Sequence, residues 1–300
     1  MTRFLNSLLA LCCALAALPA LSGTLSLLPD EANHITLPFE MESGYILLPG
    51  AVRGVSGVYM FDTGTQFTFL LNNTVIPLEL TGTPSPGKAG SGQTFEIYRH
   101  DDAGPLTVAG QTHAHSGPVI SGTLRWMTEQ FRPDFLGFAG YALMREHEMT
   151  IDYQTQTIAL DRLDADGKPL AARSPLPADA ITLRFDGFDD DRPNLPYVMA
   201  RVAGLDIEVM FDTGTAGYLD LTPEGRQTLE ATQAIRTHAN GAVSLPGLTL
   251  GGRPAPNAAT LIQASTKNRL VMGYASLVLY RSIWNYPRGE ITLIPVGSQP

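Results

Sequence analysis

Two carboxyl groups lie in identical surroundings in this sequence. Residues 60–65 and 210–215 both read Met-Phe-Asp-Thr-Gly-Thr, so Asp62 and Asp212 are 150 positions apart (212 − 62) in a chain of 300 residues. Two carboxyl groups held close together share one proton, and one can then act as a general base on a bound water while the other acts as a general acid. We therefore expect each aspartate to belong to one half of a duplicated structure, with an active site where the halves meet. Two unrelated but similar β-turns are the alternative, because Asp-Thr-Gly also favours turns.

Apolar segments flank the motifs and predict that each aspartate follows a buried β-strand. Residues 58–61 are apolar and residues 207–211 mostly so, and each segment runs directly into its aspartate. Residues 67–71 predict a second apolar strand that leaves the first motif. Short apolar runs bounded by Gly, Asp and Thr are typical of strands in a β-rich protein.

The two halves also match further along the chain. Leu136-Gly137 corresponds to Met272-Gly273, and a predicted hairpin follows each pair. The interval from aspartate to glycine is 75 residues in the first half (137 − 62) and 61 residues in the second (273 − 212). The first half therefore carries fourteen additional residues (75 − 61), which we place at about residues 82–105. Internal repetition on this scale indicates a duplicated architecture.

The composition restricts the class of protein. A hydrophobic fraction of 44% with 16% charged residues describes a globular chain with enough apolar side chains for a sizeable core. The formal net charge of −9 argues against nucleic-acid binding, which requires a basic face. We therefore expect no nucleic-acid partner.

The first 22 residues have the pattern of a secretory signal peptide. Residues 5–21 are almost wholly apolar, and Ala20-Leu21-Ser22 is a suitable cleavage site. An uncleaved membrane anchor is the alternative, because the apolar run is near the lower length limit for a membrane span. Cys12 and Cys13 both lie in this segment, so the mature chain would have no disulfide and no thiol nucleophile. We expect an exported protein, periplasmic or secreted.

The remaining chain divides into two similar parts. We predict a first domain at 23–162, a linker at 163–180 and a second domain at 181–300. The linker is inferred from a segment rich in Asp, Ala, Pro and Lys without hydrophobic periodicity. In the first domain, residues 82–92 are rich in Gly, Pro and Ser and predict a loop, and residues 94–100 alternate as a strand does.

These features together resemble the aspartic peptidase superfamily. An apolar strand, Asp-Thr-Gly-Thr and a later apolar-Gly step are typical of it, and the Leu136-Gly137 segment with its following Ile-Asp-Tyr hairpin is most similar to bacterial retropepsin-like domains. Two such domains in one chain resemble the bilobal arrangement of pepsin, over about residues 34–162 and 181–296. The resemblance implies an all-β, mostly antiparallel fold with a few short helices, in two barrel-like lobes related by a pseudo-twofold with a cleft between them.

The resemblance also implies roles around the catalytic pair, Asp62 and Asp212. The first threonine of each motif would hydrogen-bond across the pseudo-twofold, the glycine would allow a tight turn, and the second threonine would hydrogen-bond the carboxylate. A distant glycine in each half would pass beneath the catalytic loop. The supporting residues implied in this way are Thr63, Gly64, Thr65, Thr213, Gly214, Thr215, Gly137 and Gly273.

Some features depart from secreted pepsins. Those enzymes usually follow the first motif with Ser and a nearby Trp, whereas Gln66 and Phe67 follow Thr65 in this chain, and no propeptide is evident. The best candidate for a flap over the substrate is the loop Gly90-Ser91-Gly92 with the following Tyr98. An ordinary surface loop is the alternative.

Other polar clusters predict less. His113 and His115 could share a strand face as metal ligands, but no carboxylate or thiol partners lie near them in sequence. Residues 146–148, Glu-His-Glu, lack the second histidine of a zinc-protease helix, and residues 189–191 lack the glycine and distal glutamate of a calcium loop. We expect no metal and no cofactor.

The sequence therefore predicts an exported aspartic endopeptidase that hydrolyses peptide bonds with a water activated between two aspartates. The expected partner is a polypeptide substrate in the cleft between the lobes, and the expected state is a monomer. A non-catalytic peptide-binding or regulatory module on the same fold is the main alternative. Intact motifs in both halves favour the enzyme. In a third arrangement each half would pair with its counterpart in another chain.

Overall fold

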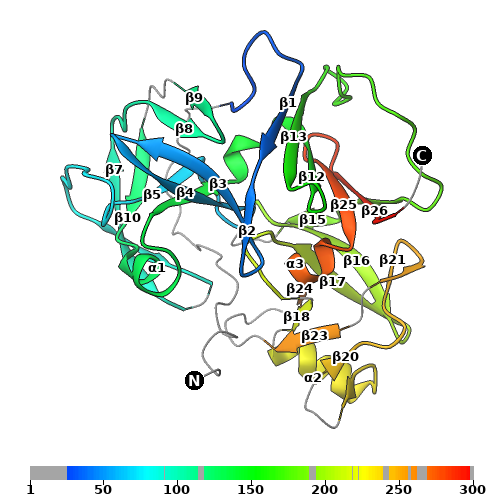
Figure 1. Ribbon diagram of the computed structural model, residues 1–300. Coiled ribbons are helices and arrows are strands. Elements are labelled where there is room, and N and C mark those ends of the chain that lie inside the picture. Colours follow the sequence, from blue (N-terminus) through cyan, green and yellow to red (C-terminus); the bar gives the residue numbers. More distant parts are fainter. Residues whose placement is uncertain are drawn as a thin grey trace.

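The protein is mostly β (Figure 1). The computed structural model describes residues 26–90, 92–113, 118–188, 194–217, 219–221, 223–238, 243–255, 258–261 and 269–297, and the predicted signal peptide at 1–22 lies outside these ranges. Strands in the described residues form three sheets with chiefly antiparallel pairing, as the sequence predicted. The helices in the same ranges are short: α1 (Arg125–Gln130), α2 (Pro223–Ala231), α3 (Tyr274–Leu277) and a 3-10 helix (Tyr141–Leu143).

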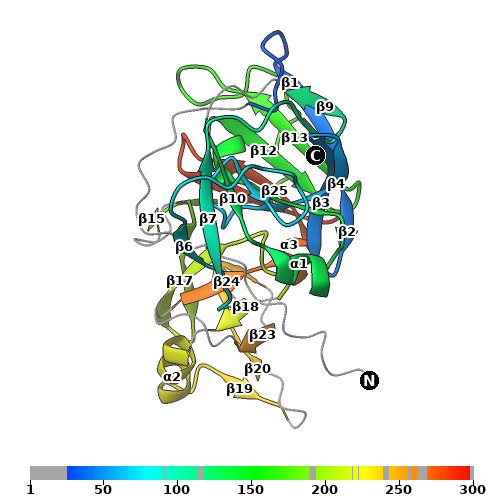
Figure 2. The ribbon, with the colours of Figure 1, turned by 90° about the vertical axis from the view of Figure 1, so that its left-hand side faces the viewer.

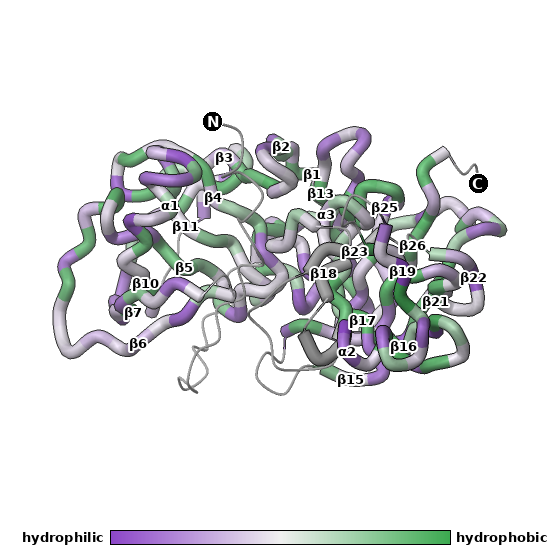
Figure 3. The backbone as a smooth tube through the Cα atoms, turned by 90° about the horizontal axis from the view of Figure 1, so that it is seen from below, coloured by the Kyte–Doolittle hydropathy of each residue, from purple (hydrophilic) through white to green (hydrophobic). Residues whose placement is uncertain are grey.

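The first sheet is built from the first half of the chain. Its order across the sheet is β6 (Ser85–Lys88), β7 (Thr94–His100), β10 (Val119–Gly122), β5 (Phe69–Asn72), β11 (Phe135–Gly140), β4 (Val55–Asp62), β3 (Tyr45–Val52), β8 (Leu106–Val108) and β9 (Gln111–His113), with β2 (Glu40–Glu42) paired to β3. The hydrophobic stretches of β5 and β11 are green in Figure 3. Their side chains are buried throughout, which is why these strands lack an alternating sequence pattern.

The second sheet is built from the second half. Its order is β19 (Arg236–Thr237), β20 (Val243–Ser244), β23 (Ala258–Leu261), β18 (Leu219–Leu221), β24 (Arg269–Met272), β17 (Leu205–Phe211), β16 (Pro196–Val202), β21 (Thr249–Leu250) and β22 (Arg253–Pro254), with β15 (Gly187–Phe188) paired to β16. Figure 2 shows β17, β24 and β18 toward one end of the molecule, away from β9.

Equivalent strands occupy the same places in both sheets. The strand that leads into the aspartate, β4 or β17, lies between an antiparallel partner (β3 or β16) and a parallel one (β11 or β24). The strand order is open in each sheet, running from β6 to β9 and from β19 to β22. Within the described residues neither sheet therefore forms a closed barrel.

A third sheet joins the two halves, and we call it the shared sheet. Its order is β1 (His34–Pro38), β13 (Thr157–Arg162), β12 (His147–Asp152), β25 (Tyr280–Asn285), β26 (Glu290–Pro295) and β14 (Ile181–Arg184). The order is a palindrome of equivalent strands, with β12 and β25 pairing antiparallel at the centre. One face is apolar and buried, as at Ile151, Trp284 and Leu293, which belong to the main hydrophobic core.

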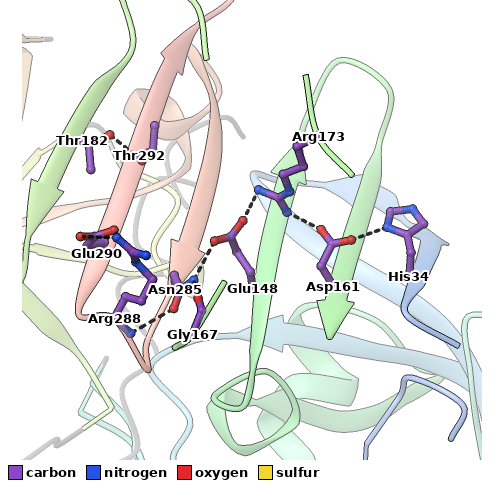
Figure 4. A network of polar contacts seen from close by, with 10 residues as sticks. All are labelled: His34, Glu148, Asp161, Gly167, Arg173, Thr182, Asn285, Arg288, Glu290 and Thr292. Carbon is purple, nitrogen blue, oxygen red and sulfur yellow. Dashed lines mark hydrogen bonds and ion pairs between the residues drawn. The ribbon is translucent and has the colours of Figure 1, made fainter. Parts of the chain in front are cut away.

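The segment predicted as a linker crosses the other, polar face of the shared sheet. Residues 163–180 connect β13 to β14, and their described backbone forms only one isolated β-bridge, between Leu163 and Pro169. Arg173 forms ion pairs with Glu148 of β12 and Asp161 of β13, and Asp161 is also bonded to His34 of β1 at 2.7 Å (Figure 4). The segment is thus held to the sheet by the ion pairs of Arg173 and by a hydrogen bond from Asn285 Nδ2 to the Gly167 carbonyl oxygen at 2.9 Å.

One local prediction in the first half was wrong. Residues 82–92 were expected to be loop, but Ser85–Lys88 forms β6 and pairs antiparallel with β7. Pro86 is tolerated because β6 is an edge strand in the described sheet, where a missing N–H donor costs no ladder hydrogen bond.

Candidate active site

The structure brings the two repeated motifs into contact within one chain. The backbone N–H of Thr63 donates to Thr213 Oγ1 at 3.0 Å, and the N–H of Thr213 donates to Thr63 Oγ1 at 3.1 Å. The Thr213 hydroxyl also donates to the carbonyl oxygen of Phe61 at 3.2 Å. The predicted threonine contact between the halves is therefore present and reciprocal.

Each aspartate accepts hydrogen bonds from its own loop. Asp62 accepts the Gly64 N–H on Oδ1 at 2.7 Å and the Thr65 hydroxyl on Oδ2 at 2.8 Å. Asp212 accepts the Gly214 N–H on Oδ1 at 2.8 Å. The tight turn after each aspartate aims the glycine N–H back at the carboxyl group two residues earlier, as an Asx turn does.

The two carboxyl groups lie side by side. A Cβ added to Gly214 would come within 2.3 Å of Asp62 Oδ1, so the second motif passes directly against the first carboxyl group. Asp62 and Asp212 are hydrogen-bonded to each other. Such an approach requires a glycine at position 214 and a proton between the two carboxyl groups.

Burial raises the pKa of Asp62 well above its usual range, and the Asp212 charge and the hydrogen bond between the two carboxyl groups raise it further. The Thr65 hydroxyl and the Gly64 N–H lower the pKa of Asp62, but they do not outweigh burial. Asp62 therefore keeps its proton at a higher pH than an ordinary aspartate does, and the two carboxyl groups can share that proton.

The supporting glycine of the first half is Gly140 rather than the predicted Gly137. Gly140 pairs with Asp62, and its Cβ would lie 2.4 Å from the Thr65 carbonyl oxygen. Gly273 has the same relation to Thr215, with its Cβ also 2.4 Å from that carbonyl oxygen. The pairing decides the match: Ala139 lies opposite Phe61 and Met272 opposite Phe211, so the residue that follows each, Gly140 or Gly273, is the equivalent one.

Gly137 has a different task. Its φ is +138°, and a Cβ there would lie 2.1 Å from the carbonyl oxygen of Leu70. A glycine is needed at this position because β11 lies unusually close to the backbone of its paired neighbour β5. With Gly140 as the landmark, the aspartate-to-glycine interval in the first half is 78 residues (140 − 62), or 17 more (78 − 61) than in the second half.

The second threonines of the motifs differ. Thr65 donates to Asp62 as predicted, whereas the buried hydroxyl of Thr215 has no hydrogen-bond partner among the described residues. The prediction for Thr215 was therefore wrong. Asp212 takes its hydrogen bonds from Gly214 and Asp62 instead.

Asn194 was missed by the sequence analysis. Its side chain is almost fully buried, and Nδ2 donates to the carbonyl oxygen of Thr63 at 2.5 Å. The partner lies 131 positions away (194 − 63), so no local pattern marks it. The strand pairing shows that Asn194 is equivalent to Gly44 of the first half. Asn194 lies three residues before Tyr197, which pairs with Met210. Gly44 likewise lies three residues before Leu47, which pairs with Met60.

The predicted flap residues lie on a hairpin. Gly90 and Gly92 are in the turn between β6 and β7, where the Ala89 N–H donates to the Gln93 carbonyl oxygen at 2.8 Å. Tyr98 lies on β7, and its hydroxyl donates to Glu96. Ser91 lies outside the described residues. The flap role of this hairpin stays a prediction.

The histidine and acidic clusters that the sequence analysis considered do not form a metal site in the described residues. Burial lowers the pKa of His113, while His115 and residues 189–191 lie outside the described ranges. His147 and Glu148 lie on a strand, β12, not on a helix. In the part of the chain that the structure describes, no group of three histidine, cysteine or acidic side chains could hold a metal ion.

Neither a protein-family model nor a curated protein sequence matches the chain. Among the described helices, none is long and apolar enough to cross a membrane.

Proposed function

We propose that the protein is an aspartic endopeptidase with Asp62 and Asp212 as its catalytic pair. One observation carries the proposal: two buried carboxyl groups, each supplied by one copy of the same motif, are hydrogen-bonded to each other between loops tied by reciprocal threonine contacts. In this proposal the two halves, at about 23–162 and 181–300, are retropepsin-like lobes, and a polypeptide substrate binds in the cleft between them.

The chemistry follows from one shared proton. The ionised carboxylate takes a proton from a bound water as the water oxygen bonds to the carbonyl carbon, and the protonated carboxyl gives its proton to the carbonyl oxygen. When the resulting diol collapses, the C–N bond breaks, the amine nitrogen takes a proton from the pair, and a diol hydroxyl returns one. The pair ends as it began, with one proton.

We also propose that the chain is exported, through residues 1–22, and that it acts as a monomer. The monomer proposal is supported by the direct contact of both motifs within one chain. Pairing of each half with another chain would require these contacts to be broken.

The experiment compares purified wild-type protein with Asp62→Asn and Asp212→Asn on a fluorescein-labelled unfolded casein between pH 3 and pH 7. Each substitution should lower kcat by about 10³-fold, because each removes one acid–base partner. Asp206→Asn is the matched control, because Asp206 is exposed and paired only with exposed Arg201. Near-wild-type cleavage by either active-site variant would refute the shared pair.

A non-catalytic peptide-binding module on the same fold is favoured by one observation, the complete burial of both carboxyl groups at 0% exposure. A statine-containing peptide separates the two functions, because its hydroxyl replaces the bound water. Tight binding that Asp62→Asn abolishes, together with no cleavage at any pH, would establish the binding module instead of the enzyme.

A further inference from the structure

Four tyrosines surround the candidate site in two equivalent sets. Tyr141 follows Gly140, and Tyr274 follows Gly273 at the same offset of 133 positions (274 − 141). Tyr153 and Tyr286 follow the ends of β12 and β25, also 133 positions apart (286 − 153). The repeat thus places one tyrosine beside each catalytic loop and one at the end of each central strand of the shared sheet.

The first set is tied directly to the catalytic loops. The backbone N–H of Tyr141 donates to the Thr65 carbonyl oxygen at 2.8 Å, and that of Tyr274 donates to the Thr215 carbonyl oxygen at 2.7 Å. Any displacement of either tyrosine backbone is therefore passed to the loop that carries an aspartate.

The rings of the two sets cross between the halves. Tyr141 of the first half packs edge-to-face on Tyr286 of the second, with ring centroids 4.7 Å apart, and Tyr274 of the second half packs on Tyr153 of the first at 5.4 Å. Both arrangements are in the range that aromatic quadrupoles favour. Each catalytic loop is thus hydrogen-bonded to a tyrosine whose ring contacts the opposite half.

Further aromatic rings hold the outer tyrosines in place. Phe39 packs on Tyr153 with centroids 6.1 Å apart, and the equivalent Phe185 packs on Tyr286 at 5.7 Å. Tyr153 and Tyr286 are 6% and 8% exposed, so neither ring has room to turn away into solvent. In each crossed contact the ring from the end of the central strand is therefore buried, and the ring beside the catalytic loop is partly buried.

The hydroxyl groups contribute less than the rings. The buried Tyr286 hydroxyl has no hydrogen-bond partner among the described residues. Burial raises the pKa of Tyr153 and of Tyr286. The neighbouring tyrosine and the Asp212 charge raise both pKa values further, so both hydroxyl groups stay neutral across the working range. Tyr153 and Tyr286 therefore act on the carboxyl pair through their packing rather than through their own ionisation.

We propose that the two crossed pairs, Tyr141–Tyr286 and Tyr153–Tyr274, are positioning residues that set the distance and orientation of the two catalytic loops. This inference rests on the proposed function, in which proton sharing requires the loops to stay in register. Threonine contacts join the motifs at their centre, and the tyrosine pairs brace them from outside. Misplacement of catalytic groups by about 1 Å can cost on the order of 10²-fold in rate.

The experiment measures kcat, KM and the pH profile for Tyr141→Leu and Tyr274→Leu, with Tyr141→Phe and Tyr274→Phe as conservative variants. The leucine variants should lower kcat by about 10- to 100-fold with KM within about twofold, and should move the pH profile, because the carboxyl pair is no longer held together. The phenylalanine variants should restore near-wild-type values, because they keep the ring.

Phe131→Leu is the matched control. Phe131 makes comparable edge-to-face contacts, with Tyr45 at 5.7 Å and Phe135 at 6.3 Å, but all three rings belong to the first half. It should lower the melting temperature as a leucine variant does while leaving kcat and the pH profile unchanged. Equal effects of Phe131→Leu and Tyr141→Leu on kcat would overturn the proposal, as would a change confined to KM.

A second measurement keeps the inference separate from the proposed function. If the wild-type protein cleaves nothing, the proposed enzyme fails, and the crossed pairs are then tested by double-mutant cycles in denaturant unfolding with leucine at 141, 286 or both. Coupling between these positions with additivity between 141 and 153 supports crossed pairing. Full additivity between 141 and 286 overturns it.

Discussion

The two halves of the molecule follow the same backbone path and differ in the side chains around the candidate site. Equivalent strands occupy equivalent places in the two larger sheets, and the shared sheet is a palindrome of both halves. The two halves differ in one hairpin strand: β7 of the first half has seven residues, whereas the equivalent strand of the second half, β20, has two residues. Duplication thus explains where the aspartates meet, and divergence explains why their surroundings are unequal.

The inequality extends to the outer face of the shared sheet. Register places Glu148 of β12 opposite Asn285 of β25, and the equivalent of Glu148 in the second half is Arg281 (148 and 281 differ by the same 133 positions). Asp161 likewise corresponds to Ile294. The ion pairs of the linker are with the acidic, first-half side through Arg173, whereas the second-half side bonds the linker backbone, as Asn285 does at the Gly167 carbonyl oxygen. A cavity of about 610 Å³ between linker and sheet is lined in part by Arg281.

Replacing Arg173 with Met should destabilise the fold more than replacing Arg281, the arginine on the second-half side of the shared sheet. Arg173 neutralises two carboxylates whose side chains are 10% and 5% exposed, Glu148 and Asp161. Removing this shared cation should lower the free energy of unfolding at pH 7 by about 2–3 kcal/mol. The loss is smaller than for a fully buried pair because the arginine is partly exposed and because His34 and Asn285 still bond the two carboxylates. Urea unfolding monitored by tryptophan fluorescence measures this loss of stability.

Arg281→Met is the control, because Arg281 has no ion-pair partner among the described residues. It should change the free energy of unfolding by less than about 0.5 kcal/mol. Adding Glu148→Gln and Asp161→Asn to Arg173→Met should recover most of the loss, because the uncompensated charges are gone. Equal losses in the two single arginine variants would mean that the linker contacts do not stabilise the fold.

Thr65→Val and Thr215→Val compare the two motifs at their second threonines, where only Thr65 bonds its aspartate. The Thr65 hydroxyl lowers the pKa of Asp62, so its removal lets the pair keep its proton to higher pH. The basic limb of kcat/KM should therefore move to higher pH in Thr65→Val, because the ionised carboxylate loses a hydrogen bond that stabilises it. Thr215→Val should leave this limb in place, because its hydroxyl bonds nothing among the described residues. The same displacement in both variants would show that the two motifs are equivalent in solution.

The sequence could predict the aspartates because an identical hexapeptide occurs twice, and the resemblance to aspartic peptidases implied the threonine contact between the two copies. It could not predict Gly140, because Leu136-Gly137 resembles Met272-Gly273 more closely than Ala139-Gly140 does, and only the strand pairing shows which glycine lies beside the catalytic loop. The lack of a bond to Thr215 depends on how Asp212 is satisfied by Asp62, which is a property of the assembled site. The mostly β fold was predictable from short apolar runs and turns, whereas β6 was hidden in a segment rich in Gly, Pro and Ser.

Asn194 offers the finest comparison, because Gly44 occupies the equivalent place in the first half. Asn194→Gly makes the second half resemble the first and removes the bond from Nδ2 to the Thr63 carbonyl oxygen. A neutral hydrogen bond contributes about 1 kcal/mol, so kcat should fall about fivefold while KM stays within about twofold. Asn73→Gly is the control, because Asn73, in the turn after β5, donates to Ser121 of β10 at 3.1 Å instead of to a motif residue. A wild-type kcat in Asn194→Gly would show that the threonine and tyrosine contacts alone hold the first loop, and that the halves differ at this position without consequence for the carboxyl pair.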